Sequence, residues 1–154
     1  MEVLMEEITN PLKVAFADTY AFYVKAQNYH WNVEGPLFPM YHEFFGNIYE
    51  EVGGAIDRFA EEIRAAGAYA PGAFRRFAEL SNIEDELLII GASQMVGTLY
   101  TDNMKVYASL KMARDMADKY EDNGLVNFLE ERLDAHKKHD WMLRVTMKWA
   151  IDPV

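Results

Sequence analysis

Four long stretches of helical periodicity dominate this chain of 154 residues and constrain its fold more than any other feature. Apolar residues recur three and four positions apart over residues 11–33, 39–66 and 93–120, and again from the turn at EDNG to about residue 150. No segment alternates apolar and polar residues as a half-buried strand does, and there is no internal repeat. The sequence therefore predicts an all-α protein whose four helices pack as a bundle.

Local signals give boundaries to these helices. Asn10-Pro11 has the form of an N-cap followed by proline at the first helical position, so we expect the first helix to begin there. Gly35-Pro36 lies just beyond the end of this helix, and Gly67 is the predicted stop of the second one.

The lengths of the connections predict how the four helices are joined. Short turns follow the first and third helices, and each turn predicts an antiparallel hairpin. About 25 residues separate the second helix from the third, and residues 74–80 within them can form a short helix. Such a connection can cross the whole bundle, because helices of about 22 to 28 residues are roughly 33 to 42 Å long. The predicted fold is a ferritin-like four-helix bundle with one long crossover, and residues 1–154 are expected to form a single domain.

The composition excludes several classes of protein and of site. Because there is no cysteine, disulfide scaffolds, thiolate zinc sites and cysteine nucleophiles are ruled out, and any metal ligand must be nitrogen or oxygen. The 25 acidic residues outnumber the 15 basic ones, and the net charge of −10 argues against tight nucleic-acid binding. The acidic start of the chain does not read as a secretory signal, and no apolar run is long enough to cross a bilayer. We therefore expect a cytoplasmic protein with no membrane partner.

Two histidines flank the Gly-Pro turn after the first predicted helix. His30 lies at the end of that helix, and His42 lies near the start of the next. Histidine is the commonest metal-binding side chain, although a histidine among aromatic residues is often an ordinary buried residue. A di-iron site inside a ferritin-like bundle needs a Glu-x-x-His step on each of two helices, and no histidine of this chain follows a glutamate by three positions. A site of that kind is excluded.

Two carboxylates, Asp57 and Glu61, lie four positions apart on the second predicted helix. This spacing puts them on one face with their Cβ atoms roughly 6 Å apart, and such a pair can share one cation. The alternative is a solvated face on which Arg58 and Arg64 balance the acids.

The histidines and the carboxylates can meet only across a subunit boundary. The fifteen residues from His42 to Asp57 span roughly 22 Å of helix, so the two cannot hold one ion within a subunit. If two such helices pack antiparallel about a two-fold axis, the start of one lies beside the end of the other, and two identical sites form. The glycines at positions 46, 53 and 54 each cost the helix about 1 kcal/mol relative to alanine. Close approach of a partner helix is one explanation for them, and a local kink is the other.

The segment HWNVEGPLFPMYHEFFGNIYEEVGGAIDRFAEEIRAAG, residues 30–67, resembles the signature of the Dps family of mini-ferritins. That signature combines His-Trp, a Gly-Pro turn, a second histidine and an Asp-x-x-x-Glu step before an isoleucine. A second segment, HKKHDWMLR at residues 136–144, is similar to the last helix of the family. The resemblance covers most of the chain, and the combined spacing is more specific than either segment alone.

The resemblance implies a hollow homo-oligomer, a dodecamer built from two-fold dimers, with ferroxidase centres between two-fold-related subunits. It implies that His30 and His42 come from one subunit and Asp57 and Glu61 from its neighbour, as the catalytic and metal-binding residues, with Trp31 beside them. The implied function is iron storage and detoxification. Fe²⁺ is oxidised by hydrogen peroxide, or more slowly by O₂, and ferric oxide collects in the cavity, which protects against oxidative stress. The implied cofactor is iron, with zinc as a competing ion.

One position departs from the pattern of the family. Four residues after the second histidine the family usually has an acidic residue, and this chain has Gly46. A missing carboxylate weakens the second iron position, so the alternative is a metal-binding or structural shell with impaired ferroxidase activity. Glu43 and Glu50 are carboxylates nearby, but neither lies at the matching position.

Other polar residues are expected to play smaller parts. His136 and His139 are predicted to be surface or packing residues rather than ligands. The carboxylates of residues 118, 121 and 122 cluster near a turn, where the resemblance implies an acidic iron-entry pore and the alternative is a solvated run of charge. Some members of the family bind DNA through flexible basic termini. Because this chain starts with acidic residues and ends in WAIDPV, DNA binding is not expected.

Overall fold

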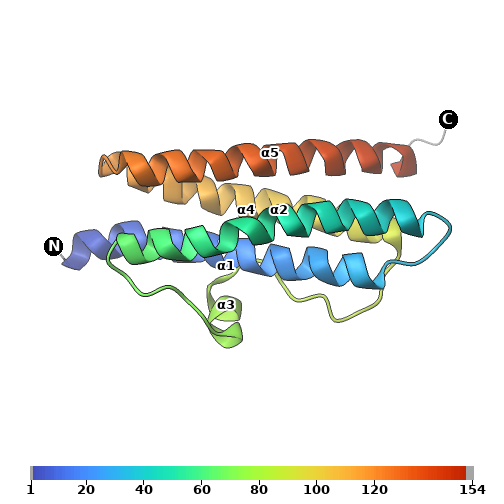
Figure 1. Cartoon of the computed structure of the whole chain (residues 1–154), viewed down its shortest axis with the longest axis horizontal. Coiled ribbons are helices and arrows are strands. Elements are labelled where there is room, and N and C mark those ends of the chain that lie inside the picture. Colours follow the sequence, from blue (N-terminus) through green and yellow to red (C-terminus); the bar gives the residue numbers. More distant parts are fainter. Residues whose placement is uncertain (1, 152–154) are drawn as a thin grey trace.

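The structure, a computed structural model, describes residues 2–151, and within them it contains five helices and no strand. The four long helices are α1 (Glu2–Asn32), α2 (Phe38–Ala65), α4 (Ala92–Lys119) and α5 (Asn123–Ile151), and the short helix α3 (Phe74–Leu80) lies between α2 and α4. Figure 1 shows the long helices side by side along one axis. The all-α bundle expected from the periodicity is confirmed. In the described part of the chain, no helix combines the length and the hydrophobicity needed to cross a bilayer.

The long crossover, residues 66–91, decides the topology. It carries α3 along the outside of the bundle, from the end where α2 stops to the end where α4 begins (Figure 1). Consequently α2 and α4 run parallel, whereas α1 with α2 and α4 with α5 form antiparallel hairpins. Gly67 stops α2 as predicted: its φ of 93° lets the N–H of Ala68 donate to the carbonyl of Ile63 at 3.2 Å.

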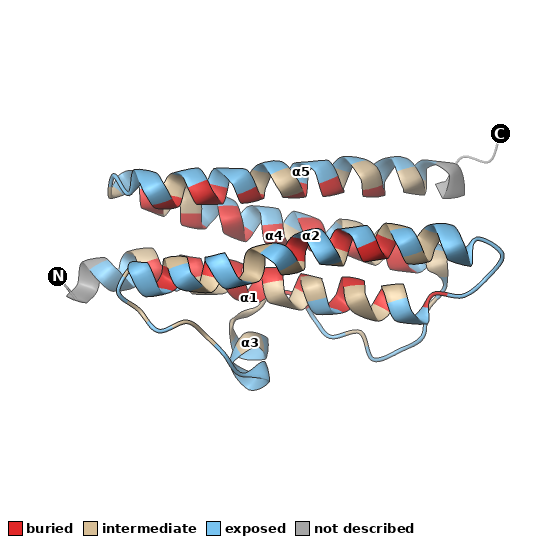
Figure 2. Ribbon diagram, viewed as in Figure 1, coloured by how far each residue is buried: buried red, intermediate tan, exposed pale blue. Residues whose placement is uncertain are grey.

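The apolar core lies along the bundle axis. Figure 2 shows the buried faces of the four long helices pointing toward one another. Phe59 of α2 links two of these helices, since its ring centroid lies 5.4 Å from that of Phe16 in α1 and 5.2 Å from that of Phe128 in α5. Each fully buried side chain of this size contributes about 1.5–3 kcal/mol of hydrophobic stabilisation. This core sets α1 against α2, the two helices that carry the predicted histidines.

The first helix begins earlier than its sequence predicts. Pro11 lies inside α1, not at its first position, although a proline inside a helix removes one backbone hydrogen bond and costs about 3 kcal/mol. In these additional turns, Glu7 accepts hydrogen bonds from Lys119 and Tyr120 at the far end of α4. The predicted start at Asn10-Pro11 is therefore wrong.

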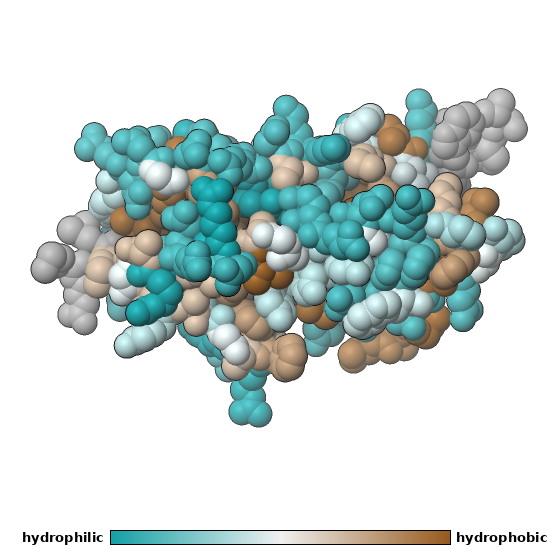
Figure 3. All heavy atoms as spheres, viewed as in Figure 1, coloured by the Kyte–Doolittle hydropathy of each residue, from teal (hydrophilic) through white to brown (hydrophobic). Residues whose placement is uncertain are grey.

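A buried carboxylate ties the crossover to α1. Asp18 accepts hydrogen bonds from the hydroxyl of Ser81 at 2.8 Å, from the backbone N–H of Asn82 at 2.6 Å and from its side-chain amide at 3.0 Å. Elsewhere the crossover exposes large apolar side chains, namely Tyr69, Phe74, Leu87, Leu88 and Ile89. Figure 3 shows apolar surface along the lower edge of the bundle, where the crossover lies.

Candidate metal centre

His30 and His42 face each other across the α1–α2 turn with their rings stacked. The ring centroids are 3.8 Å apart, and the ring planes differ by 16°. Nδ1 of His30 lies 2.5 Å from the carbonyl oxygen of His42, and Nδ1 of His42 lies 2.6 Å from the carbonyl oxygen of His30. Because a carbonyl oxygen can only accept, each Nδ1 carries the proton and donates it. In the neutral rings both Nε2 atoms are then left with a lone pair for a metal ion.

Gly46 makes this pairing possible. It is buried in α2, and a Cβ at this position would lie 2.9 Å from Nδ1 of His30. Gly53, two helical turns further on, has the same relation to Tyr23, whose ring would lie 2.8 Å from an added Cβ, whereas Gly54 faces open space. At positions 46 and 53 the close approach therefore comes from α1 of the same chain, an explanation that the sequence analysis did not include.

Aromatic rings enclose the histidine pair. Phe38 stacks on His42 with a centroid distance of 4.9 Å, and Tyr49 lies against His30 at 5.1 Å. Trp31, expected beside the site, has 63% of its surface exposed. The sequence reasoning missed Tyr49, although its position seven residues after His42 places both on one face of α2.

Asp57 and Glu61 lie exposed one turn apart, toward the C-terminal end of α2. Arg58 pairs with Glu131 of α5 at 2.9 Å, and Arg64 donates to a backbone carbonyl just beyond α2. Among the described residues, neither arginine forms an ion pair with Asp57 or Glu61, and both carboxylates lie on a solvent-exposed face of α2. Both carboxylates keep their oxygens for solvent or a cation.

The structure brings the two histidines together and the two carboxylates together, but it leaves the pairs apart. Fifteen residues of the same helix separate His42 from Asp57, which corresponds to roughly 22 Å. Over the residues that the structure describes, no three His, Asp or Glu side chains converge closely enough to hold a metal ion. A donor set that combines both pairs requires a second copy of the chain.

A buried polar cluster lies between α2, α4 and α5. Arg132 donates to both carboxylate oxygens of Glu51, at 2.7 and 3.0 Å, and Nε2 of His139 lies 2.8 Å from the same carboxylate. His136 is fully buried and donates from Nδ1 to the side-chain oxygen of Asn103 at 2.8 Å. Both histidines are buried packing residues, as predicted, and Arg132 also lies 3.4 Å from Nε2 of His136.

These contacts shift two pKa values. Burial by itself would raise the pKa of Glu51, but the hydrogen bonds and charges of His139 and Arg132 outweigh burial and hold this pKa well below its usual range. Burial lowers the pKa of His136 well below its usual range, and the charge of Arg132 lowers it further. His136 is therefore neutral, and Glu51 is ionised.

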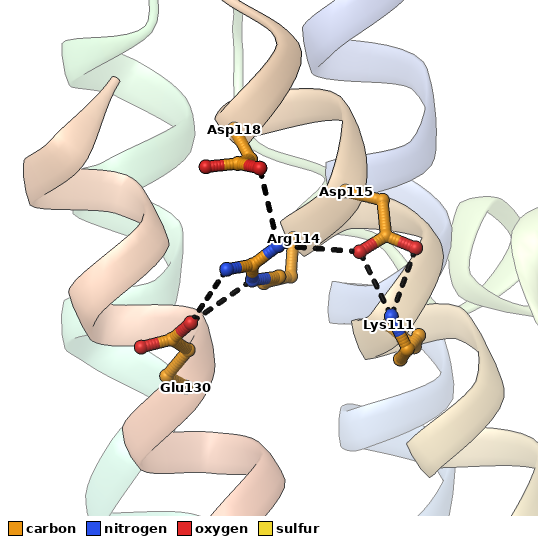
Figure 4. A network of polar contacts seen from close by, with 5 residues as sticks. All are labelled: Lys111, Arg114, Asp115, Asp118 and Glu130. Carbon is orange, nitrogen blue, oxygen red and sulfur yellow. Dashed lines mark hydrogen bonds and ion pairs between the residues drawn. The ribbon is translucent and has the colours of Figure 1, made fainter. Parts of the chain in front are cut away.

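The acidic turn between α4 and α5 is partly neutralised within the subunit. Arg114 contacts Asp115 at 3.5 Å, Asp118 at 3.3 Å and Glu130 at 2.8 Å, as Figure 4 shows. Asp122 accepts a hydrogen bond from a backbone N–H in the first turn of α5 at 3.1 Å. Two of the three carboxylates proposed for an entry pore thus have structural partners, and the pore itself stays a prediction.

Known proteins share this fold and up to about a third of this sequence. A family model described as a ferritin-like domain matches residues 10–148. The DNA protection during starvation protein of Brevibacillus brevis is 33% identical over 132 residues, which cover 86% of this chain and 89% of that protein. The chain belongs to the Dps-like mini-ferritins.

Solved structures agree with the assignment of this chain to the Dps-like mini-ferritins. The crystal structure of a Dps protein from Bacillus brevis has a TM-score of 0.89 and 30% sequence identity, and the match covers 95% of this chain and 98% of that one. Dps from Vibrio cholerae O1, described as a member of a broad superfamily of ferritin-like diiron-carboxylate proteins, has a TM-score of 0.90 over 95% and 92% of the two chains. Because the identity to Dps from Vibrio cholerae O1 is 23%, this match shows only that the two proteins share a fold.

Proposed function

We propose that this mini-ferritin stores and detoxifies iron as a single-domain subunit of a hollow dodecamer built from two-fold dimers. Fe²⁺ is oxidised by hydrogen peroxide, or more slowly by O₂, at centres shared between two subunits, and ferric oxide collects in the cavity. The observation that supports this most strongly is the reciprocal hydrogen bonding of His30 and His42, which uses both Nδ1 atoms and leaves both Nε2 atoms free to bind a metal ion. Consumption of peroxide by the bound iron protects against oxidative stress.

The donor set suits the substrate. His30 and His42 of one subunit supply two imidazole nitrogens, and Asp57 and Glu61 of its neighbour supply carboxylate oxygens. Imidazole binds Fe²⁺ well, and the harder carboxylate oxygens favour Fe³⁺, so the ligands themselves favour oxidation. Zn²⁺ accepts the same donors and competes with iron. The net charge of −10 argues against binding of DNA by this shell.

A shell that binds metal without oxidising it is the second candidate, and Gly46 is the observation that favours it. The family usually has a carboxylate at this position, whereas here the ring of His30 fills the space that a Cβ would need. One ligand of the second iron position is therefore missing, which would slow any reaction that needs two irons side by side.

Anaerobic loading with Fe²⁺ followed by addition of peroxide tests the proposal. The double variant Asp57→Ala, Glu61→Ala removes one half of the donor set at exposed positions of α2. The double variant Glu84→Ala, Asp85→Ala removes two exposed carboxylates from the crossover and serves as the matched control. We expect fast ferric formation in the parent and in the control, and a rate close to that of protein-free solution in the first variant.

The outcomes separate the two candidates. A parent that binds Fe²⁺ but oxidises it at the protein-free rate would favour the binding shell. A parent that neither binds nor oxidises Fe²⁺ would contradict both.

A further inference from the structure

A file of rings runs from the candidate centre along the contact between α1 and α2. Centroid distances are 3.8 Å from His42 to His30, 5.1 Å from His30 to Tyr49, 5.9 Å from Tyr49 to Tyr23, 5.9 Å from Tyr23 to Tyr20 and 4.3 Å from Tyr20 to Phe77. We call these six side chains the ring file. Its three tyrosines are half-buried, and Tyr20 lines a cavity of about 740 Å³ between α1 and the crossover.

Two glycines of α2 allow the ring file to form. Tyr23 and His30 are seven residues apart on α1, and the glycines that they approach, Gly53 and Gly46, are seven residues apart on α2. An added Cβ would lie 2.8 Å from the ring of Tyr23 and 2.9 Å from that of His30. Because a glycine inside a helix costs about 1 kcal/mol relative to alanine, the chain gives up stability twice at these positions. The result is a place for Tyr49 between the two rings of α1.

The ring file can supply an electron for the reduction of hydrogen peroxide. Hydrogen peroxide takes up two electrons, whereas one Fe²⁺ supplies one, and Gly46 has removed a carboxylate that would help to hold a second Fe²⁺. Tyr49 carries the first oxidisable O–H group of the ring file, and its ring lies against that of His30, a proposed ligand. Building on the proposed function, we propose that Tyr49 supplies the second electron, through His30, at a centre that holds a single Fe²⁺.

The reaction balances with iron, peroxide and one tyrosine. Fe²⁺, Tyr–OH and H₂O₂ give Fe³⁺, Tyr–O•, OH⁻ and H₂O. The O–O bond breaks, iron and phenol each lose one electron, and the phenolic proton ends in water. A later Fe²⁺ and one proton from solvent return the phenoxyl radical to tyrosine and form a second Fe³⁺. No hydroxyl radical leaves the centre in this sequence.

The next rings offer the radical further aromatic side chains until it is reduced. Tyr23 and Tyr20 follow Tyr49 at contact distance, so the oxidising equivalent can move along the ring file. The side-chain amide of Gln27 donates to the phenolic oxygen of Tyr23 at 3.3 Å. A phenoxyl oxygen, which can only accept, retains this hydrogen bond.

Electron paramagnetic resonance of freeze-quenched samples tests the proposal. The full chain is loaded anaerobically with one Fe²⁺ per subunit, mixed with one equivalent of hydrogen peroxide and frozen. Tyr49→Phe keeps the ring and its packing but removes the oxidisable O–H, and Tyr107→Phe on α4, outside the ring file, is the matched control. We expect a tyrosyl radical in the parent and in the control and a signal at least ten-fold smaller in Tyr49→Phe. That variant should also release more hydroxyl radical to a spin trap in solution.

Three results would overturn the proposal. The first is an undiminished tyrosyl signal in Tyr49→Phe. The second is a signal that disappears only in Trp31→Phe, since it would assign the radical to the exposed indole next to His30. The third is fast ferric formation with no radical in the parent, which would leave the proposed function intact. If the parent forms no ferric iron, the proposed function fails, and this inference fails with it.

Discussion

At the scale of single residues, the candidate centre depends on the groups that hold the ligands as much as on the ligands. The carbonyl of each histidine holds Nδ1 of the other, so the tautomer and the direction of both Nε2 atoms are set before a metal ion arrives. Partners of this kind change metal affinity by about 10–100-fold when they are removed. Gly46 is one of these supporting residues, because the absence of a side chain leaves room for the ring of His30.

Gly46→Ala should weaken metal binding while leaving the helix intact. The added Cβ would lie 2.9 Å from Nδ1 of His30, so the ring must move and the reciprocal hydrogen bonds must lengthen. We expect a loss of affinity of about ten-fold or more for Co²⁺ or Zn²⁺, measured by titration. Gly54→Ala is the control, because a Cβ there meets open space and should stabilise α2 by up to about 1 kcal/mol with unchanged affinity. Equal affinities in the two variants would contradict this account of Gly46.

His136 should make the free energy of unfolding depend on pH. Its folded-state pKa is lowered by burial, so below about pH 6.5 the unfolded chain takes up a proton that the folded chain does not. Stability therefore falls as the pH decreases from about 7 to 5, by at most about 1.4 kcal/mol per pH unit for this one group. The lowered pKa of Glu51 acts in the same direction at lower pH, because its stabilising contribution is present above about pH 4.3 and is lost as the pH falls through its folded-state value.

His136→Gln removes this titration. We expect the variant to be less stable than the parent by about 1–3 kcal/mol at neutral pH, because a buried hydrogen bond is disturbed, and to lose less stability on acidification. Urea unfolding at a fixed protein concentration measures both effects, with the exposed Lys137→Gln as the control. The same loss of stability between about pH 7 and pH 5 in parent and variant would mean that His136 does not drive it.

At the scale of elements, the crossover depends on one carboxylate. Asp18, buried in α1, accepts three hydrogen bonds from Ser81 and Asn82 and thereby anchors the segment that leads to α4. Asp18→Asn replaces one accepting oxygen by a donor that faces other donors. We expect a loss of about 1–3 kcal/mol of stability and faster amide hydrogen exchange over residues 81–91. The exposed Asp85→Asn is the control, and equal exchange in the two variants would show that Asp18 does not anchor the crossover.

At the scale of the whole molecule, the proposed function requires each subunit to supply half of two different centres. A chain with His30→Ala and His42→Ala keeps its carboxylates, and a chain with Asp57→Ala and Glu61→Ala keeps its histidines. In a mixed two-fold dimer of these chains, one centre lacks both halves and the other is intact. Complementation therefore distinguishes a shared centre from one that lies within a subunit.

Co-expression of the two double variants should restore ferroxidase activity that each lacks alone. With random pairing, half of the centres receive intact histidines, and independently half receive intact carboxylates. About a quarter of the centres are therefore complete, and we expect about a quarter of the parental rate of ferric formation. Shells of each variant, purified separately and mixed without exchange of subunits, are the control. Activity that stays absent in the co-expressed shells would contradict a centre shared between these two pairs of residues.

Much of this fold follows from local physics. Burial with a period of 3.6 residues identifies the four long helices, because each helix must bury one stripe wherever it packs. The length of the connection after Gly67 predicts the parallel arrangement of α2 and α4, because a short loop cannot cover the length of the bundle. The spacing of His30, His42, Asp57 and Glu61 already excludes a centre within one subunit, since it depends only on the rise of a helix.

By itself, then, the sequence determined the helices and their connectivity, because these depend on distances along the chain. It indicated the four candidate ligands through their spacing together with the resemblance to the Dps family. Only the tertiary structure showed that α1 starts before Pro11, in turns where Glu7 contacts Lys119 and Tyr120 from across the bundle. It also decided that Gly46 admits an imidazole of the same chain and that Tyr49 lies against it. These features depend on which side chains meet between packed helices, and periodicity along a single helix carries no information about its neighbour.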